Sequence, residues 1–405
     1  MRFIIVILFL VSFYGISTFM TRPFVWLSIL IMLVFTIKNW NKHDKYENII
    51  VMYSLFVICS CFYSYFFNRQ PLVSSIEYSR HNLGILAYFV AKGLCPSVDV
   101  VKKYLNILIA ITIVCYILQW LIYPTVLFAG SINDFDITDN QFRMRFYCSI
   151  LFYLAFLYGI NKYIIEKKIF FLLYTVIGFL PIIIMGFRSL IAMLLLSALL
   201  LIFKISKKGA SDIFKYLIIG SIAFYSALQV PIVQDKIDEM ATRQETGGTF
   251  DNKDYVRNVG LVYYTKAFSE KPLMWILGGG NPQVGVDSEP INDYQKLFSQ
   301  AYEMFLYWND LGLIGLSFII GIIAVTLLVY LCIRTMYDCG DPNLQYIRFC
   351  IFAALVGTII TSMEIYRNGN LVMLGILMYI VHAQKQNEID WKNNNDYEYR
   401  NNNIP

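Results

Sequence analysis

The chain of 405 residues is 58% hydrophobic and only 15% charged, and its mean hydropathy is +0.56. Soluble domains average about 45–50% apolar and about 25% charged residues, so the composition excludes a soluble globule and indicates a polytopic membrane protein. The net charge of +5 does not indicate a nucleic-acid partner, because basic residues in membrane proteins record topology and no nucleic-acid-binding motif is present. The positions of the eight cysteines indicate neither a disulfide framework nor a metal site.

Apolar windows predict an all-α fold with about twelve transmembrane helices. The first window follows Met1-Arg2 and resembles a signal peptide, but it lacks a cleavage pattern of small residues, so we expect a retained span. In chain order, the predicted spans cover residues 3–19, 24–37, 48–67, 83–94, 104–128, 146–161, 169–186, 189–205, 214–233, 309–333, 346–363 and 371–383.

One apolar run has to be divided into two spans. Residues 169–203 contain a single charged side chain, Arg188. As one helix this run would be about 52 Å long, whereas the hydrocarbon core of a bilayer is about 30 Å thick. We therefore predict a break between Pro181 and Ser189, which places Arg188 on a short turn at one membrane face.

Basic residues divide by type between the two predicted membrane faces. Fifteen of the twenty lysines fall on one side, which the positive-inside rule makes cytoplasmic together with both chain termini. Nine of the thirteen arginines fall on the other side. The positive-inside rule does not distinguish the lysine ammonium from the arginine guanidinium, but only the planar guanidinium binds phosphate with two parallel hydrogen bonds. We therefore expect the outer arginines to contact phosphate. The alternatives are a chance distribution and contacts with lipid headgroups. The outer arginines are Arg22, Arg69, Arg80, Arg143, Arg145, Arg188, Arg243, Arg257 and Arg367.

Two outer loops stand out between the predicted spans. The loop over residues 130–145 is acidic and ends with Arg143 and Arg145, and the larger loop is long enough to carry short helices as a lid. The predicted organisation is spans one to nine in residues 1–233, the large outer loop in 234–300, three spans in 301–383, and a disordered, asparagine-rich cytoplasmic tail in 384–405.

Several short motifs occur in a particular order on the outer side. The motifs are Gly186-Phe187-Arg188-Ser189, Tyr255-Val256-Arg257-Asn258 with an amphipathic stretch to Phe268, Lys271-Pro272, Leu277-Gly278-Gly279-Gly280-Asn281 and Leu311-Gly312-Leu313-Ile314-Gly315. Their order resembles the superfamily of Wzy-type O-antigen polymerases and O-antigen ligases, over roughly Phe142 to Ile323.

One departure from the superfamily favours a polymerase over a ligase. The ligases are expected to carry a His-Asn pair before the G-L-I-G motif, whereas this chain has Gln300-Ala301-Tyr302-Glu303-Met304, and its large loop contains no histidine. The departure also leaves the catalytic base open.

The resemblance implies a substrate and a reaction. The substrate would be an undecaprenyl-pyrophosphate-linked oligosaccharide at the periplasmic face of a bacterial inner membrane, where a sugar hydroxyl of one repeat unit attacks the anomeric carbon of the growing chain. The lipid pyrophosphate would leave, and arginines would stabilise its charge. We therefore expect a glycosyltransferase that needs neither a metal nor a cofactor.

Four arginines are the predicted pyrophosphate ligands, and two of them are also predicted to be catalytic. Arg188 lies where a lipid-linked pyrophosphate has to lie, although a salt bridge to a neighbouring helix is the alternative. Arg257 begins an amphipathic helix, with a solvated loop arginine as the alternative. Arg143 and Arg145 suit phosphate contact and interfacial anchoring equally.

The acceptor hydroxyl needs a base, for which a partly desolvated carboxylate is suitable. Glu303, beside Tyr302 and near Trp308, is the predicted catalytic base; Asp310 and His81 follow. The alternative is that Glu303 is only a favourable charge at a helix N-terminus. Weaker predicted substrate contacts are Arg80, His81, Tyr302, Gly279 and Gly280, the glycines because they let backbone approach a phosphate.

Two rival functions remain. A ligase would move finished glycan to the lipid A core, and a polysaccharide flippase or transporter would account for about twelve spans. Scarce charges in the span centres and the large outer loop count against transport. For a polymerase, a chain-length regulator and a flippase in the membrane are the expected partners.

Overall fold

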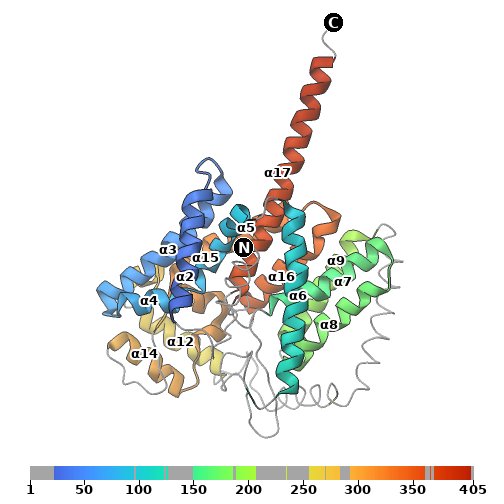
Figure 1. Ribbon diagram of the computed structural model, residues 1–405. Helices are drawn as coiled ribbons and strands as arrows, with labels where there is room; N and C mark the ends of the chain where they lie inside the picture. Colours follow the sequence, from blue (N-terminus) through green and yellow to red (C-terminus); the bar gives the residue numbers. More distant parts are fainter. Residues whose placement is uncertain are drawn as a thin grey trace.

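The computed structural model describes residues 22–94, 97–122, 125, 149–185, 188–206, 234, 255–269, 271–282, 292–360, 365 and 369–402. Within these ranges the secondary structure is helical, and no strand occurs (Figure 1). The predicted spans at 3–19 and 214–233, together with Arg143 and Arg145, lie outside the described residues.

Each predicted span within the described ranges coincides with a helix or helical segment. Among the residues that the structure describes, three helical stretches are long and apolar enough to cross a membrane, namely Lys45–Asn68, Val98–Gln119 and Trp308–Asp338. The total of about twelve spans stays a prediction. The elements are α2 (Arg22–Asn39), α3 (Lys45–Asn68), α4 (Leu72–Ser79), η1 (Asn82–Leu86), α5 (Ala87–Leu94), α6 (Val98–Leu121), α7 (Ile150–Glu166), α8 (Phe170–Met185), α9 (Arg188–Ile205), α12 (Val256–Ser269), α13 (Pro272–Leu277), α14 (Asp293–Glu303), η3 (Trp308–Leu311), α15 (Gly312–Asp338), η4 (Pro342–Leu344), α16 (Gln345–Ile360) and α17 (Asn370–Asn402).

The apolar run around Arg188 forms two helices, as predicted. Helix α8 ends at Met185 and α9 begins at Arg188, so the break lies later than Pro181, which is inside α8. A proline inside a helix loses one hydrogen bond but is tolerated where neighbouring helices support the backbone. Here α8 packs closely on α7, because a Cβ atom on Gly178 would lie 2.5 Å from the backbone nitrogen of Phe156.

The sequence predicts a disordered tail over residues 384–405, and the structure describes a helix over residues 384–402 of this segment. Helix α17 continues without interruption from Asn370 to Asn402 and projects from the helical body (Figure 1). Its first exposed turns contain glutamine, lysine and glutamate, which are good helix formers. Lys385 also donates a 2.6 Å hydrogen bond to Asp338 at the end of α15, which anchors α17 where it leaves the core.

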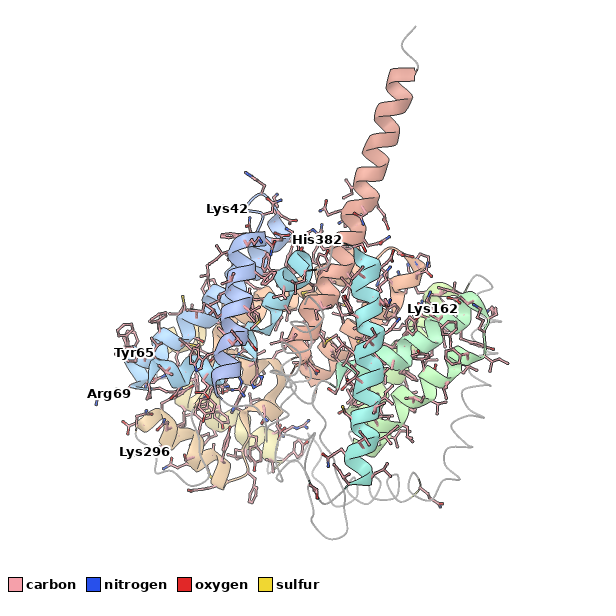
Figure 2. All side chains as sticks on the ribbon, viewed as in Figure 1. Lys42, Tyr65, Arg69, Lys162, Lys296 and His382 are labelled. Carbon is pink, nitrogen blue, oxygen red and sulfur yellow. The ribbon has the colours of Figure 1, made fainter. Side chains whose placement is uncertain are left out.

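Different sets of residues lie at the two ends of the helical body. Figure 2 shows Lys42 and His382 toward one end and Arg69 and Lys296 toward the other. We call the first the lysine-rich end and the second the lid end. The lid consists of α12, α13, α14 and η3.

Candidate functional site

The lid is held on α15 by a cluster of aromatic side chains. Tyr264, Phe268, Phe298 and Phe318 are fully buried, and the ring centroids of Phe268 and Phe318 lie 4.5 Å apart. The Tyr264 hydroxyl donates a 2.9 Å hydrogen bond to the carbonyl of Leu306. Aromatic pairs of this kind add packing energy to the buried area, so these contacts stabilise the lid on the first turns of α15.

Helix α15 is broken at Gly321, whose φ of 84° and ψ of 155° are not helical. The break leaves the carbonyls of Phe318 and Ile319 without their usual partners within the helix. Residues 278–282, here called the glycine loop, supply new ones: Gly279 donates to Phe318 (2.8 Å) and Gly280 donates to Ile319 (2.9 Å). The lid is therefore joined to the broken span by backbone hydrogen bonds.

Side chains from α3 and the lid hold the other side of the glycine loop. Asn68 donates to the carbonyl of Gly279 (3.0 Å), Gln70 donates to that of Asn281 (2.7 Å), and Tyr294 donates to that of Gly280 (2.6 Å). The backbone of Gly279 and Gly280 is thus buried and paired on both sides. The sequence predicts that these glycines let backbone approach a phosphate, whereas in the structure their amides already pair with carbonyls of α15. A Cβ atom on Gly279 would lie 2.5 Å from the Tyr294 hydroxyl, and one on Gly280 would lie 2.6 Å from Cβ of Ser64 on α3, so their small size serves close packing against α14 and α3.

Both catalytic arginines of the prediction lie at helix N-termini. Arg188 is the first residue of α9, and only its backbone belongs to the described part. Arg257 is the second residue of α12 and is partly buried, with its guanidinium 6.0 Å from the ring centroid of Tyr255. Neither helix has an acidic residue in its first turn. A helix N-terminus favours anions and disfavours cations, so each arginine adds to a positive potential that a bound anion would offset.

Glu303 does not lie in the partly desolvated place expected for it. It is the last residue of α14 and is exposed, so it is also not the favourable N-terminal charge of the alternative. Trp308 donates a 3.0 Å hydrogen bond to the Tyr302 hydroxyl, and burial raises the pKa of Tyr302 to about 12. Tyr302 is therefore protonated at neutral pH and suits hydrogen bonding to a sugar better than proton abstraction. Asp310 is partly buried in η3.

Arg80 and His81 form the turn between α4 and η1. The guanidinium of Arg80 donates to the carbonyl of Glu77 (2.8 Å). His81 is partly exposed as a residue, but its Nδ1 atom is enclosed. Burial of the ring, and then the charge of Arg80, hold the pKa of His81 well below 6.5. The glycine loop reaches the same region, since Asn281 donates a 2.8 Å hydrogen bond to the carbonyl of Tyr78 on α4.

The shifted pKa of His81 predicts an acid sensitivity. Below about pH 6.5 the unfolded chain binds a proton at this residue that the folded protein does not, so stability falls with decreasing pH until the lower folded pKa is reached. The slope from this one group is at most about 1.4 kcal/mol per pH unit. Thermal unfolding of the purified protein at a series of pH values should show a smaller acid loss for His81→Gln, whereas the exposed-residue control His43→Gln should follow wild type. Equal losses in all three proteins would refute this role of His81.

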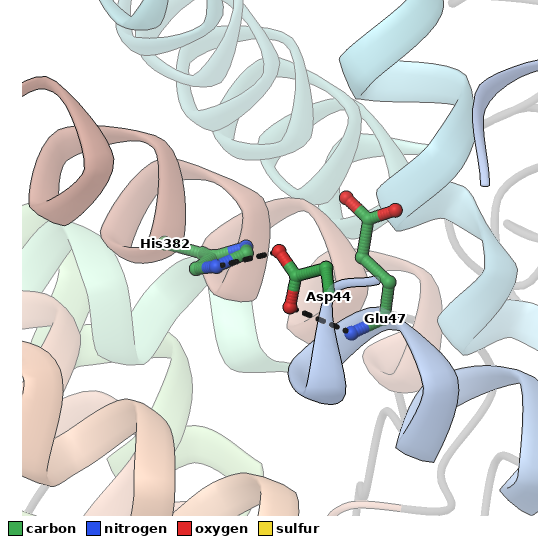
Figure 3. Close-up of side chains that lie close together, drawn as sticks. All are labelled: Asp44, Glu47 and His382. Carbon is green, nitrogen blue, oxygen red and sulfur yellow. Dashed lines mark hydrogen bonds and ion pairs between the residues drawn. The ribbon is translucent and has the colours of Figure 1, made fainter. Parts of the chain in front are cut away.

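The lysine-rich end contains a polar cluster to which the sequence analysis assigned no function. Asp44, Glu47 and His382 place one ligand atom each within 4.8 Å of one another (Figure 3). They line a cavity of about 580 Å³ together with Lys92 and Tyr88. The spacing of Asp44 and Glu47 across one helical turn was visible in the sequence, but nothing in the sequence links them to His382, more than 300 positions away.

No known family model matches this chain, and a search of curated proteins finds no relative.

Proposed function

We propose that this chain is a Wzy-type polysaccharide polymerase that joins undecaprenyl-pyrophosphate-linked repeat units into O-antigen or capsule-type polysaccharide. In this proposal, the lysine-rich end faces the cytoplasm of a bacterium and the lid end faces the periplasm, with about twelve spans in the inner membrane. The order of outer motifs in the sequence supports the family, and the positions of Arg188 and Arg257 support the chemistry.

The observation that carries the proposal is that both arginines lie in the first turn of a helix that has no acidic residue in that turn. A guanidinium and a helix N-terminus both favour an anion, and the fork of the guanidinium fits two phosphate oxygens. In the reaction, the acceptor hydroxyl forms a bond to the anomeric carbon, and the bond from that carbon to the pyrophosphate breaks. Arg188 and Arg257 would stabilise the negative charge that develops on the leaving pyrophosphate.

The proton of the acceptor hydroxyl has to pass to a base. Glu303, the predicted base, is exposed and would be desolvated only when a bound substrate covers it. Asp310 is already partly buried in η3, next to Trp308 and therefore near Tyr302. Arg80 and His81 are proposed substrate contacts only, as are Arg143 and Arg145, which lie outside the described residues.

A deletion of the gene tests the proposal in the cell. Loss of a polymerase should leave glycans of a single repeat unit on the surface, with long chains restored by the wild-type gene; the measurement is a size separation of surface glycans. If long glycans instead accumulate on the lipid carrier, the chain is a ligase. Long surface-attached chains that persist in the deletion strain would overturn both assignments.

One structural observation favours the rival assignment as a transporter. Discontinuous helices often form substrate sites at mid-membrane depth in transporters, and α15 is discontinuous at Gly321. In this chain, however, the glycine loop lies at the break and its amides pair with the carbonyls of Phe318 and Ile319. The backbone of the glycine loop at the break connects the lid to α15 and leaves the break without an open substrate site. This arrangement agrees better with an enzyme than with a transporter.

A further inference from the structure

The cluster at the lysine-rich end combines two carboxylates and an imidazole from distant parts of the chain. Asp44 and Glu47 lie at the start of α3, and His382 lies on α17 (Figure 3). Glu47 and His382 are buried, with exposed fractions of 2% and 8%. Charged side chains are seldom buried unless they are paired or hydrogen-bonded, so these buried groups need partners that offset their charge.

The hydrogen bonds assign the proton on His382. The Tyr88 hydroxyl donates to Glu47 Oε1 (3.1 Å), so at its 2.5 Å contact with His382 it accepts from Nδ1–H. His382 Nε2 then carries a lone pair, and it accepts a 3.2 Å hydrogen bond from the amide of Gln386. A histidine held through Nδ1–H has the orientation usual for a metal ligand, and its Nε2 lone pair can bind a metal ion in place of the Gln386 amide.

Two acceptors face each other in this tautomer. Asp44 Oδ2 lies 3.2 Å from His382 Nε2, while Asp44 Oδ1 is used to cap α3 by accepting from the backbone of Tyr46. A carboxylate oxygen and an imidazole lone pair at this distance repel unless a cation lies beside both. Two ligands of a tetrahedral zinc ion with bonds of about 2.1 Å are separated by about 3.4 Å, close to the distance found.

Charge and access agree with a divalent cation. Asp44 and Glu47 together carry two negative charges. Lys92 contributes one positive charge, and its Nζ atom lies 2.5 Å from Glu47 Oε1, so one negative charge is left for a cation to offset. The cavity of about 580 Å³ opens beside all three ligands and is also lined by His43 and Lys45. It provides an access route, space into which Lys92 can withdraw, and room for a water molecule as a fourth ligand.

We propose that Asp44, Glu47 and His382 bind a divalent transition-metal ion that connects α17 to the start of α3. An imidazole ligand favours zinc over magnesium or calcium, which take oxygen ligands. The site lies at the end of the molecule opposite the lid, so this proposal is independent of the proposed polymerase chemistry. It revises the expectation from the sequence that the chain has no metal site.

Zinc titration of the purified full-length protein in detergent, after removal of metals with a chelator, tests the proposal. We expect one zinc ion per chain and a raised unfolding temperature, with affinity at least tenfold lower in His382→Gln and in Asp44→Asn, which keeps a residue able to cap α3. Asp338→Asn, which changes a neighbouring ion pair with Lys385, is the control and should bind zinc like wild type. Absence of stoichiometric zinc in the wild type, or equal affinity in His382→Gln, would overturn the proposal.

The substitution Lys92→Met separates a metal site from a plain ion-pair network. If zinc competes with the ammonium for Glu47, removing the ammonium should raise the zinc affinity about tenfold and leave the zinc-bound protein at least as stable as wild type. If His382 is instead a protonated partner of Asp44, Lys92→Met should only lower the unfolding temperature, without any response to zinc. Replacing zinc with cobalt adds a spectroscopic check, since a site with one nitrogen ligand and oxygen ligands gives a visible absorption band that His382→Gln should lose.

Discussion

Replacing Gly321 with alanine is expected to destabilise the protein by about 3 kcal/mol or more and to abolish its activity. The backbone of Gly321 has φ 84° and ψ 155°, a region that is open essentially to glycine alone. A Cβ atom at this position would lie 2.3 Å from the carbonyl oxygen of Ile276 and 2.8 Å from the nitrogen of Gly278. Both neighbours are backbone atoms, so no side-chain rotation relieves the clash. Thermal unfolding of the purified variant measures the loss.

Gly278 and Gly340 provide the matched comparison. Gly278→Ala should be as damaging as Gly321→Ala, because its φ is +83° and its Cβ would lie 2.3 Å from the carbonyl of Ile319. Gly340→Ala should change stability by less than about 0.5 kcal/mol, because a Cβ atom there meets nothing within 4 Å. If Gly321→Ala unfolds at the same temperature as Gly340→Ala, the close backbone contact described between the glycine loop and α15 is wrong.

Replacing Arg188 with lysine is expected to lower the rate of polymerisation about 100-fold while the protein remains folded. Lysine keeps the charge at the start of α9 but lacks the fork that binds two phosphate oxygens at once. The defect should appear mainly in the maximal rate, because the charge on the pyrophosphate increases as the bond to the sugar breaks. Arg257→Lys should show a defect of the same kind. The measurement is the rate of chain extension on lipid-linked repeat units.

An arginine at the lysine-rich end serves as the control for these substitutions. Arg334 lies 3.0 Å from Asp338, one helical turn away, in a partly exposed ion pair that lysine can also form. Arg334→Lys should therefore extend chains at nearly the wild-type rate. A wild-type rate in both Arg188→Lys and Arg257→Lys would exclude two-pronged binding of the pyrophosphate by these arginines.

Hydrophobic pattern and length predicted the local structure well, because they depend on neighbouring residues. The division of residues 169–203 into two helices followed from bilayer thickness, and the short helices in the described part of residues 234–300 followed from the length and amphipathic stretch of that segment. The break lies between Met185 and Arg188, within the predicted range from Pro181 to Ser189. Pro181 itself lies inside α8, where contact with α7 supports the backbone. The composition of the tail indicated disorder, but its anchoring to Asp338 depends on α15 and could not be read locally.

The surroundings of several predicted site residues depend on contacts that the sequence does not show. Gly279 and Gly280 resembled a phosphate-binding loop, and only the break at Gly321 explains why their amides are already paired. Glu303 was expected in a partly desolvated place, or alternatively as a charge at a helix N-terminus, but it is exposed and ends α14 because the chain turns at Met304 and Phe305 before η3. The cluster of Asp44, Glu47 and His382 joins residues near opposite ends of the chain, so no local pattern could have predicted it.

Chain extension by the purified protein tests the central claim most directly. The full-length protein in detergent is mixed with undecaprenyl-pyrophosphate-linked repeat units, and product length is followed over time without any membrane gradient. A polymerase should give a ladder of products that differ by one repeat unit, with free lipid pyrophosphate released at each step. Repeat units that keep their original length in the presence of folded protein would contradict the assignment.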